Sequence, residues 1–352
     1  MSRIVFLDTV SPMPYDTRSF NERAVQGTEA SVMRIADSLG AWVMQHNRTS
    51  PWERYLPVQR MQADHVVVIR ESRALGQARE LFPNARLHLW LHDKLRPGSK
   101  RGRRLRGTAG VLRAAQVSII CVSDTQRQDV ANTLRWAGIE GLPVCTCYNP
   151  LDPALRVDGS PFDERQLVFF SSPNKGLAYA LDAFGTLRRA LPDLQLVVGN
   201  PGYKADALAA LPGVQFLGPQ PQPVMHAHVR RSLCTFHPNF RIPETFGLVY
   251  AESHALGTPV LTHDYGAAAE VVGDPRQLLP VKTAYRCYEG MVGGLQPRWR
   301  RLPARLAGSL GMFEAYVERI RAWRAGGRPV VGPDPRFALS AIAAQWRELL
   351  GP

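Results

Sequence analysis

The 352-residue sequence contains no apolar run near the length that crosses a membrane. Its longest apolar runs, residues 65–69 and 117–122, have the length of buried strands, whereas a transmembrane helix needs about 20 apolar residues. The N-terminus, MSRIVFLD, also lacks the apolar core and the small-residue cleavage site of a signal peptide. From these absences we expect a cytoplasmic protein without a membrane-spanning helix.

Cysteine is scarce and carries no metal-binding pattern. The sequence contains no Cys-x-x-Cys, and most of its five cysteines lie in apolar, strand-like runs (Cys121, Cys145, Cys147, Cys234 and Cys287). This set argues against a zinc site or a disulfide framework and favours buried small side chains in a reducing compartment. The sequence also lacks the Gly-x-x-x-x-Gly-Lys-Ser/Thr loop of Walker-type nucleotide sites.

Positive charge is abundant and comes almost entirely from arginine. The chain has 38 arginines, 5 lysines and a net charge of +13, which predicts attraction to anionic partners. Arginine together with many alanines, glycines and prolines is also typical of a GC-rich genome, so the total alone defines no partner. The local maximum is residues 94–106, with seven positive charges in thirteen residues.

Two interpretations of this basic run remain open. It is either a solvated loop or a surface for the phosphates of a lipid-linked acceptor or for anionic headgroups. In the second case the contacting residues would be Lys100, Arg101, Arg103 and Arg104. Nucleic acid is disfavoured as a partner, because aromatic residues do not interleave the run and no nucleic-acid-binding signature occurs.

Strand-like runs alternate with helical patterns in both halves of the chain. The strands are expected at 4–8, 41–45, 65–69, 87–91, 117–122, 144–147, 167–170, 194–198, 214–217, 233–236 and 259–262. The alternation pauses at the proline-containing segment 149–153 and then resumes. We therefore predict an α/β protein of two doubly wound, Rossmann-like domains, 1–152 and 153–335, facing a central cleft that holds the ligand. We also expect a helix at 204–211, an irregular basic stretch at 284–311 and a last helix within 336–352.

The segment Pro-Glu-Thr-Phe-Gly-Leu-Val-Tyr-Ala-Glu at 243–252 places Glu244 eight residues before Glu252. Thr245 is expected to cap a helix, which would leave the backbone amides of the next residues free to bind an anion. Those residues are Phe246, Gly247 and Leu248. The alternative is a helix that is merely acidic at its start, which the helix dipole favours.

A second motif follows the first predicted strand of the second half. Ser171, Ser172, Lys175 and Gly176 lie in a strand-to-helix turn. Helix amides and a lysine in such a turn suit a diphosphate. The alternative is an ordinary capped turn.

Together these residues resemble retaining glycosyltransferases of family 4 (glycosyl transferases group 1), which have the GT-B fold. The resemblance covers about residues 1–275 and rests on the Glu-x7-Glu spacing, Lys175-Gly176, segment 256–260, Gly27 before a helix and His92 at a strand end. It implies an acceptor side in the first domain, a donor side in the second, and a last helix that returns to the first domain.

The resemblance also implies a role for each residue. Glu252 would accept hydrogen bonds from the ribose hydroxyls, and Glu244 would face the donor sugar. Lys175 would neutralise the leaving diphosphate, and His92 would bond a hydroxyl of the donor sugar. Gly27 would allow close approach of the first-domain loop. No Asp-x-Asp motif occurs, so the resemblance implies transfer without a metal or other cofactor, with retention of anomeric configuration.

The sequence departs from the family at three places. Ser171-Ser172 stands where the family has Gly-Arg before its lysine, and Arg241 is a candidate to replace that arginine. Gln26 and Ala267 each stand where the family has glycine. These departures concern the strength of donor binding rather than the fold.

The expected function is transfer of a sugar from a nucleoside-diphosphate sugar to a glycan or lipid-linked acceptor in bacterial surface polysaccharide or lipopolysaccharide assembly. The enzyme would lie in the cytoplasm, peripheral on the inner face of the cytoplasmic membrane. One alternative is a sugar-nucleotide epimerase or hydrolase, which needs a second acid or base near His92, where Asp93 is the only adjacent candidate. The other is a non-catalytic, basic surface-binding protein.

Overall fold

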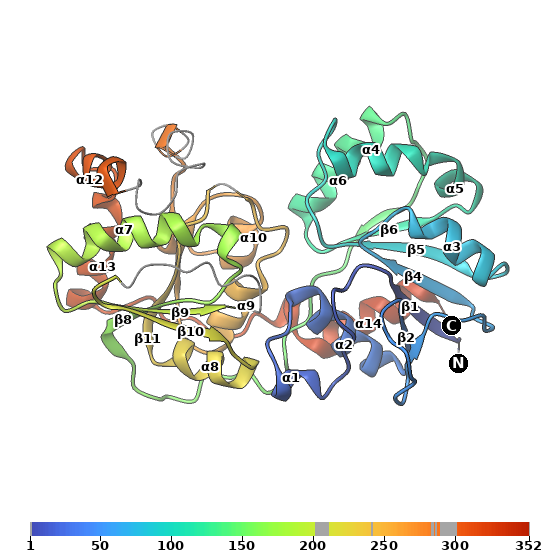
Figure 1. The fold of residues 1–352 in the computed structure, drawn as a ribbon, viewed down its shortest axis with the longest axis horizontal. Coiled ribbons are helices and arrows are strands. Elements are labelled where there is room, and N and C mark those ends of the chain that lie inside the picture. Colours follow the sequence, from blue (N-terminus) through green and yellow to red (C-terminus); the bar gives the residue numbers. More distant parts are fainter. Residues whose placement is uncertain are drawn as a thin grey trace. The chain divides into compact units, whose positions relative to one another are not determined.

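The computed structural model describes residues 2–200, 211–240, 242–282, 285, 287–288 and 301–351. The chain forms two compact units. Unit 1 consists of Met1–Ser19, Gly27–Pro153 and Pro335–Pro352, and unit 2 of Phe20–Gln26 and Ala154–Asp334. Each unit has a sheet of parallel strands between helices (Figure 1). Among the described residues, no helix is both long and apolar enough to cross a membrane.

The sheet of unit 1 has seven strands in the order β3-β2-β1-β4-β5-β6-β7. They are β1 (Ile4–Asp8), β2 (Trp42–Gln45), β3 (Tyr55–Pro57), β4 (His65–Ile69), β5 (Arg86–Leu91), β6 (Ser118–Cys121) and β7 (Val144–Thr146). The direction of winding reverses between β1 and β4, which lie side by side. The carboxyl ends of these two strands therefore form the switch point at which ligands bind in such sheets.

The helices of this part of the chain are α1 (Ser19–Glu22), α2 (Gly27–Leu39), α3 (Ala74–Leu81), α4 (Lys100–Gly107), α5 (Ala109–Ala114), α6 (Asp124–Trp136) and α14 (Leu339–Leu350). Alternate strand residues face opposite layers. Val66 and Val68 of β4 pack with Leu75 of α3. On the other face, Trp346 of α14 contacts Trp90, with ring centroids 4.8 Å apart. The last helix thus completes the core of unit 1.

The sheet of unit 2 has six strands in the order β10-β9-β8-β11-β12-β13. They are β8 (Asp163–Phe169), β9 (Gln195–Asn200), β10 (Val214–Pro219), β11 (Ser232–His237), β12 (Val260–His263) and β13 (Leu278–Leu279). Winding reverses between β8 and β11, so the switch point of this sheet lies at their carboxyl ends.

The helices of unit 2 and its boundary are η1 (Pro173–Lys175), α7 (Leu177–Ala190), α8 (Gln222–Arg230), α9 (Leu248–Ala255), α10 (Ala268–Val272), η2 (Pro275–Gln277), α12 (Arg301–Ser309), α13 (Glu314–Gly326) and η4 (Pro335–Phe337). Leu167 and Phe169 of β8 face a core shared with α7 and α13, whereas Val168 and Phe170 face α8 and α9. The expected helix at 204–211 lies almost wholly outside the described residues. So do residues 284–300 of the stretch expected to be irregular at 284–311, but its residues 301–309 form α12, so that expectation is wrong there.

Candidate functional site

Lys175 and Gly176 lie just beyond the carboxyl end of β8, at the switch point of unit 2. The short helix η1 ends at Lys175, and Gly176 then adopts a φ of +107° as the N-cap of α7. This left-handed conformation favours glycine and lets the chain turn directly from η1 into α7. Ser171, which precedes this turn, is buried, and Ser172 is half-buried. The turn places Lys175 at the N-terminal end of α7.

Lys175 forms an ion pair with Glu244, although 69 residues separate them in sequence. Its Nζ donates a hydrogen bond of 2.7 Å to Oε2 of Glu244. The side chain of Glu244 is 6% exposed and that of Lys175 is 37% exposed. The second carboxylate oxygen, Oε1, is buried and has no hydrogen-bond partner among the described residues. A buried carboxylate oxygen without a partner is costly, so this atom is available to a ligand hydroxyl.

His237, the last residue of β11, lies behind Glu244. Its Nε2 is buried without a hydrogen bond to the described residues and lies 4.0 Å from Oε1 of Glu244. Its Nδ1 lies 3.0 Å from the hydroxyl of Tyr250, which in turn lies 3.3 Å from Oγ1 of Thr262. Burial lowers the pKa of His237 to about 4, although the charge of Glu244 opposes the shift, so the ring is neutral at pH 7.

The tautomer of His237 follows from these neighbours. A lone pair on Nε2 would face the carboxylate of Glu244, so the proton is best placed on Nε2. Nδ1 then accepts a hydrogen bond from the Tyr250 hydroxyl, which accepts one from Thr262. The chain of contacts directs an N–H dipole at Glu244. Sequence motifs did not reveal His237 or Tyr250, because each looks locally like an ordinary core residue.

The backbone around Glu244 depends on Gly266. This residue has a φ of +67° and pairs with Glu244 in a parallel bridge. A Cβ atom at Gly266 would lie 2.6 Å from the carbonyl oxygen of Glu244, which accepts a hydrogen bond of 3.0 Å from the Ala267 amide. The close approach of these two segments therefore holds Glu244 in place.

The expected Thr245 cap is wrong. Helix α9 begins at Leu248, its N-cap is Gly247 with a φ of +87°, and no side chain caps it. A Cβ at Gly247 would overlap the ring of Tyr250. The left-handed turn at Gly247 delays the helix, so Phe246 precedes it as a buried residue and the free amides begin at Leu248.

Glu252 lies one turn inside α9 and is buried. Its Oε2 is 3.9 Å from Nε2 of His226, a residue of α8 that no sequence motif indicated. Arg241, the candidate replacement for the missing family arginine, lies outside the described residues. Unit 2 therefore contributes two carboxylates and one lysine at the carboxyl end of its sheet.

The remaining predicted residues belong to unit 1. Gly27 is the first residue of α2. His92 follows β5, and its ring centroid lies 4.4 Å from that of Trp90. Burial, reinforced by the charge of Arg70 and opposed by that of Asp93, lowers the pKa of His92 to about 3. His92 is therefore neutral at pH 7, which suits a hydrogen-bonding role rather than an ionic one.

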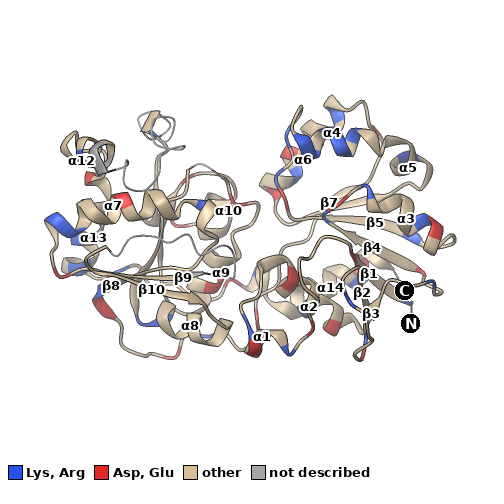
Figure 2. Ribbon diagram, in the orientation of Figure 1, with Lys and Arg blue, Asp and Glu red and all other residues tan. Residues whose placement is uncertain are grey.

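Residues 100–106 of the basic run are helical, as part of α4, whereas residues 94–99 form a loop that precedes the helix. Ser99 caps α4 by accepting a hydrogen bond of 3.0 Å from the Gly102 amide. Leu105 anchors the helix in the core. Figure 2 shows the basic residues concentrated along α4. The helical period then divides them between two directions. Lys100 and Arg103 are exposed without an acidic partner among the described residues, whereas Arg104 and the 51% exposed Arg101 pair with acidic side chains.

Comparison with known proteins gives three findings. Residues 160–283 match the family model "Glycosyl transferases group 1". The phosphatidyl-myo-inositol mannosyltransferase of Mycobacterium tuberculosis is 31% identical over 185 residues, covering 49% of this chain and 48% of that protein. That of Mycolicibacterium smegmatis is 29% identical over 199 residues, covering 53% and 51%. The chain thus spans about half the length of the curated relatives it matches.

Solved structures resemble the chain over nearly its whole length. HepE of Anabaena, in complex with UDP and glucose, has a TM-score of 0.64 at 18% identity and covers 99% of both chains. WaaG, a glycosyltransferase involved in lipopolysaccharide biosynthesis, has a TM-score of 0.59 at 14% identity, also with 99% of both chains covered. At these identities the likeness shows the fold alone, and that fold is GT-B.

Proposed function

We propose that the protein is a glycosyltransferase that uses a nucleoside-diphosphate sugar, because residues 160–283 match the model of the glycosyl transferases group 1 family. The observation that carries the proposal is the buried Glu244 carboxylate, held by Lys175 at 2.7 Å, whose second oxygen has no hydrogen-bond partner among the described residues. An acceptor oxygen beside a partly exposed cation, at a sheet switch point, suits a ligand that is both a polyol and an anion. A nucleotide sugar has both properties.

Unit 2 takes the donor. Lys175 breaks its ion pair with Glu244, or keeps it, while it binds the diphosphate. The free amides at the N-termini of α7 and α9 bind the diphosphate together with Lys175. Glu252 accepts hydrogen bonds from the ribose hydroxyls, and Oε1 of Glu244 accepts one from a hydroxyl of the transferred sugar. His92, from unit 1, bonds another hydroxyl of that sugar, and the loop that begins α2 at Gly27 adjoins the phosphates.

The reaction needs stabilisation of the negative charge that develops on the leaving diphosphate. Lys175 and the helix amides supply it as preorganised donors, so the transfer requires no divalent metal. The acceptor hydroxyl attacks the face from which the diphosphate leaves, the leaving phosphate takes its proton, and configuration is retained. EDTA should leave transfer or donor hydrolysis intact, and complete loss that manganese restores would disprove the metal-free mechanism.

Unit 1 takes the acceptor, a glycan or a lipid-linked group in bacterial surface polysaccharide or lipopolysaccharide assembly. Its exposed basic face on α4 adjoins the half-exposed Trp136, over which Arg106 lies at 5.1 Å from the ring centroid. Cationic and amphipathic aromatic side chains together suit an anionic membrane surface, which supports the proposal that the enzyme is peripheral on the inner face of the cytoplasmic membrane.

The epimerase or hydrolase alternative loses its best candidate base. Burial alone would raise the pKa of Asp93, but its hydrogen bonds with Arg70 and the charges of Arg70 and Arg101 hold that pKa below its usual value. Asp93 is therefore an ionised partner of two guanidinium groups, unsuited to exchange protons near pH 7.

The decisive experiment compares two glutamates. Glu252→Ala should weaken binding of the free nucleoside diphosphate, measured by calorimetry, because ribose contacts act before and during the reaction. Glu244→Gln should retain that binding and lower turnover with a matched donor from a donor panel. Glu318→Ala, an exposed glutamate of α13, serves as the control. An unchanged dissociation constant in a folded Glu252→Ala protein would show that the ribose assignment is wrong.

A further inference from the structure

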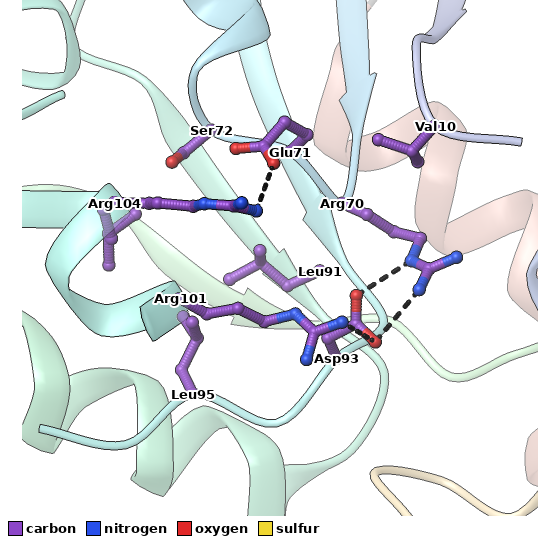
Figure 3. Close-up of a pocket in the computed structure, with 10 residues that line it drawn as sticks. Val10, Arg70, Glu71, Ser72, Leu91, Asp93, Leu95, Arg101 and Arg104 are labelled. Atoms are coloured by element: carbon purple, nitrogen blue, oxygen red, sulfur yellow. Dashed lines mark hydrogen bonds and ion pairs between the residues drawn. The ribbon is translucent and has the colours of Figure 1, made fainter. Parts of the chain in front are cut away.

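A pocket of about 160 Å³ lies within unit 1 (Figure 3). Val10, Arg70 and Asp93, which follow β1, β4 and β5 respectively, form one side, and α4 forms the other. The pocket therefore lies at the carboxyl ends of the strands where the winding of the sheet reverses. Ligand sites in doubly wound sheets occur at this position.

Arginines dominate the lining. Arg70 forms two hydrogen bonds with Asp93, of 2.8 and 3.1 Å, and Arg101 adds an ion pair of 3.1 Å to the same carboxylate. Arg104 donates a hydrogen bond of 2.9 Å to Glu71. Three guanidinium groups thus meet two carboxylates, which leaves the lining with a net positive charge.

The two arginines of α4 retain donors for a ligand. Figure 3 shows Arg101 and Arg104 extending from the helix toward Asp93 and Glu71. A guanidinium group carries five N–H donors, and within the described residues each of these two arginines uses one nitrogen in its ion pair. The hydroxyl of the buried Ser72 also lines the pocket.

The position of the Arg70 side chain is fixed by the protein itself, without a ligand. Arg70 has a φ of +64°, a left-handed conformation that is unfavourable for a non-glycine residue. Its amide donates to the Trp90 carbonyl at 2.9 Å, and its guanidinium is fixed by both oxygens of Asp93. Strain of this kind persists where the surroundings enforce it, and it concentrates at ligand sites.

We propose that this pocket binds a phosphate group of the acceptor, as a phosphomonoester or phosphodiester. Only the identification of this phosphate as part of an acceptor rests on the proposed transferase function. The paired N–H donors of a guanidinium group match the oxygens of a phosphate in geometry. The net positive charge of the lining favours an anionic ligand over a neutral sugar. A volume of about 160 Å³ is large enough for a phosphate group.

The test uses four variants on one helix. Arg101→Gln and Arg104→Gln each remove a charge that faces the pocket. Arg103→Gln and Arg106→Gln remove the same charge from the exposed face of α4. The pocket variants should fold, because Asp93 keeps Arg70 and Glu71 keeps Arg73 as partners. Circular dichroism and unfolding curves verify this.

Calorimetry with inorganic phosphate and with glycerol 3-phosphate measures the site. All variants are made in a Lys175→Ala background, so that unit 2 does not contribute. The pocket variants should each lose about tenfold in affinity, the effect of one charge-assisted hydrogen bond, whereas the Arg103 and Arg106 variants should stay within about twofold of the parent. Equal losses in all four variants, or no phosphate binding by the parent, overturn the proposal.

Vesicles of phosphatidylcholine, with and without phosphatidylglycerol, separate the two sources of phosphate. If a lipid headgroup enters the pocket, Arg101→Gln and Arg104→Gln reduce sedimentation with anionic vesicles more than the exposed-face variants do. If the phosphate belongs to a soluble acceptor, the pocket variants and the exposed-face variants differ in their affinity for inorganic phosphate and glycerol 3-phosphate but not in their sedimentation with vesicles. Either pattern supports the pocket. If the Lys175→Ala parent binds phosphate here but the protein with Lys175 intact transfers no sugar from any donor, the proposed function is refuted and the pocket stands.

Discussion

Replacing Gly266 by alanine tests whether the close approach of two backbones holds Glu244. A φ of +67° at this position costs a non-glycine residue about 1–2 kcal/mol. The new Cβ would lie 2.6 Å from both the Glu244 carbonyl oxygen and the Pro243 Cβ, and overpacking of this kind costs about 1–3 kcal/mol. Alanine also lowers the conformational entropy of the unfolded chain, which offsets about 0.4–1 kcal/mol of this destabilisation. We expect a net loss of about 2–4 kcal/mol from the free energy of unfolding.

Gly273→Ala is the matched control. Gly273 lies in the same unit, has a φ of +70°, and has no atom within 4 Å of an added Cβ. It therefore carries the conformational cost without the overlap, and we expect a loss of about 1 kcal/mol. The difference between the two variants isolates the contact with Glu244.

Native-state hydrogen exchange of the peptides covering α9 and β12 measures the stability of unit 2 directly. Because the overlap pushes on the carbonyl of Glu244, Gly266→Ala should also lower turnover with a matched donor, and Gly273→Ala should not. Equal destabilisation by the two variants would refute the argument that Gly266 is needed for space as well as for conformation.

Three further outcomes are expected. Burial lowers the pKa values of His237 and His263 to about 4 from an ordinary 6.5, so their contribution to the stability of unit 2 is complete above pH 6.5 and declines as the pH falls toward 4. Hydrogen exchange should show a loss of about 2 kcal/mol per histidine between pH 7 and pH 5, and a flat profile would contradict it. Tyr250→Phe removes the hydroxyl beside Nδ1 of His237, and should lower kcat while KM for the donor stays near that of the parent; a change in KM alone would argue against this alignment of Glu244. Ser99→Ala should destabilise α4 by about 1 kcal/mol, seen as faster amide exchange in that helix alone.

The fold class was predictable because strands that are buried on both faces appear in the sequence as continuous apolar runs. Residues 65–69 were expected as a strand and form β4, all of whose residues are buried. The three-residue strand β3 (Tyr55–Pro57) was missed, since a short edge strand that ends in proline carries little pattern. The alternation of strands and helices predicted two doubly wound domains, and the motifs gave the resemblance to glycosyl transferases group 1 and its GT-B fold, which the family match and the solved structures confirm.

The site was predictable only as separate segments. Motifs indicated Lys175 and Glu244, but not that they are in contact, because a contact across 69 residues depends on strand order. Thr245 was the expected cap by residue preference, yet Gly247 fills that position because the turn needs a positive φ. The two faces of α4 were not predicted, since neither of the two interpretations of the run assigned it a helical period. The roles of these residues in catalysis stay predictions.

The return of α14 to unit 1 sets an order of events during protein synthesis. Unit 2 is encoded between the first 153 residues and the last helix, so the ribosome releases almost all of it before α14. Until then the faces of Phe6 and Trp90 that Trp346 covers remain open to water or to chaperones. A chain truncated before residue 339 would therefore contain the whole of unit 2 but an incomplete unit 1. Quality control that recognises exposed aromatic surface would detect such a chain through unit 1, not through the unit made last.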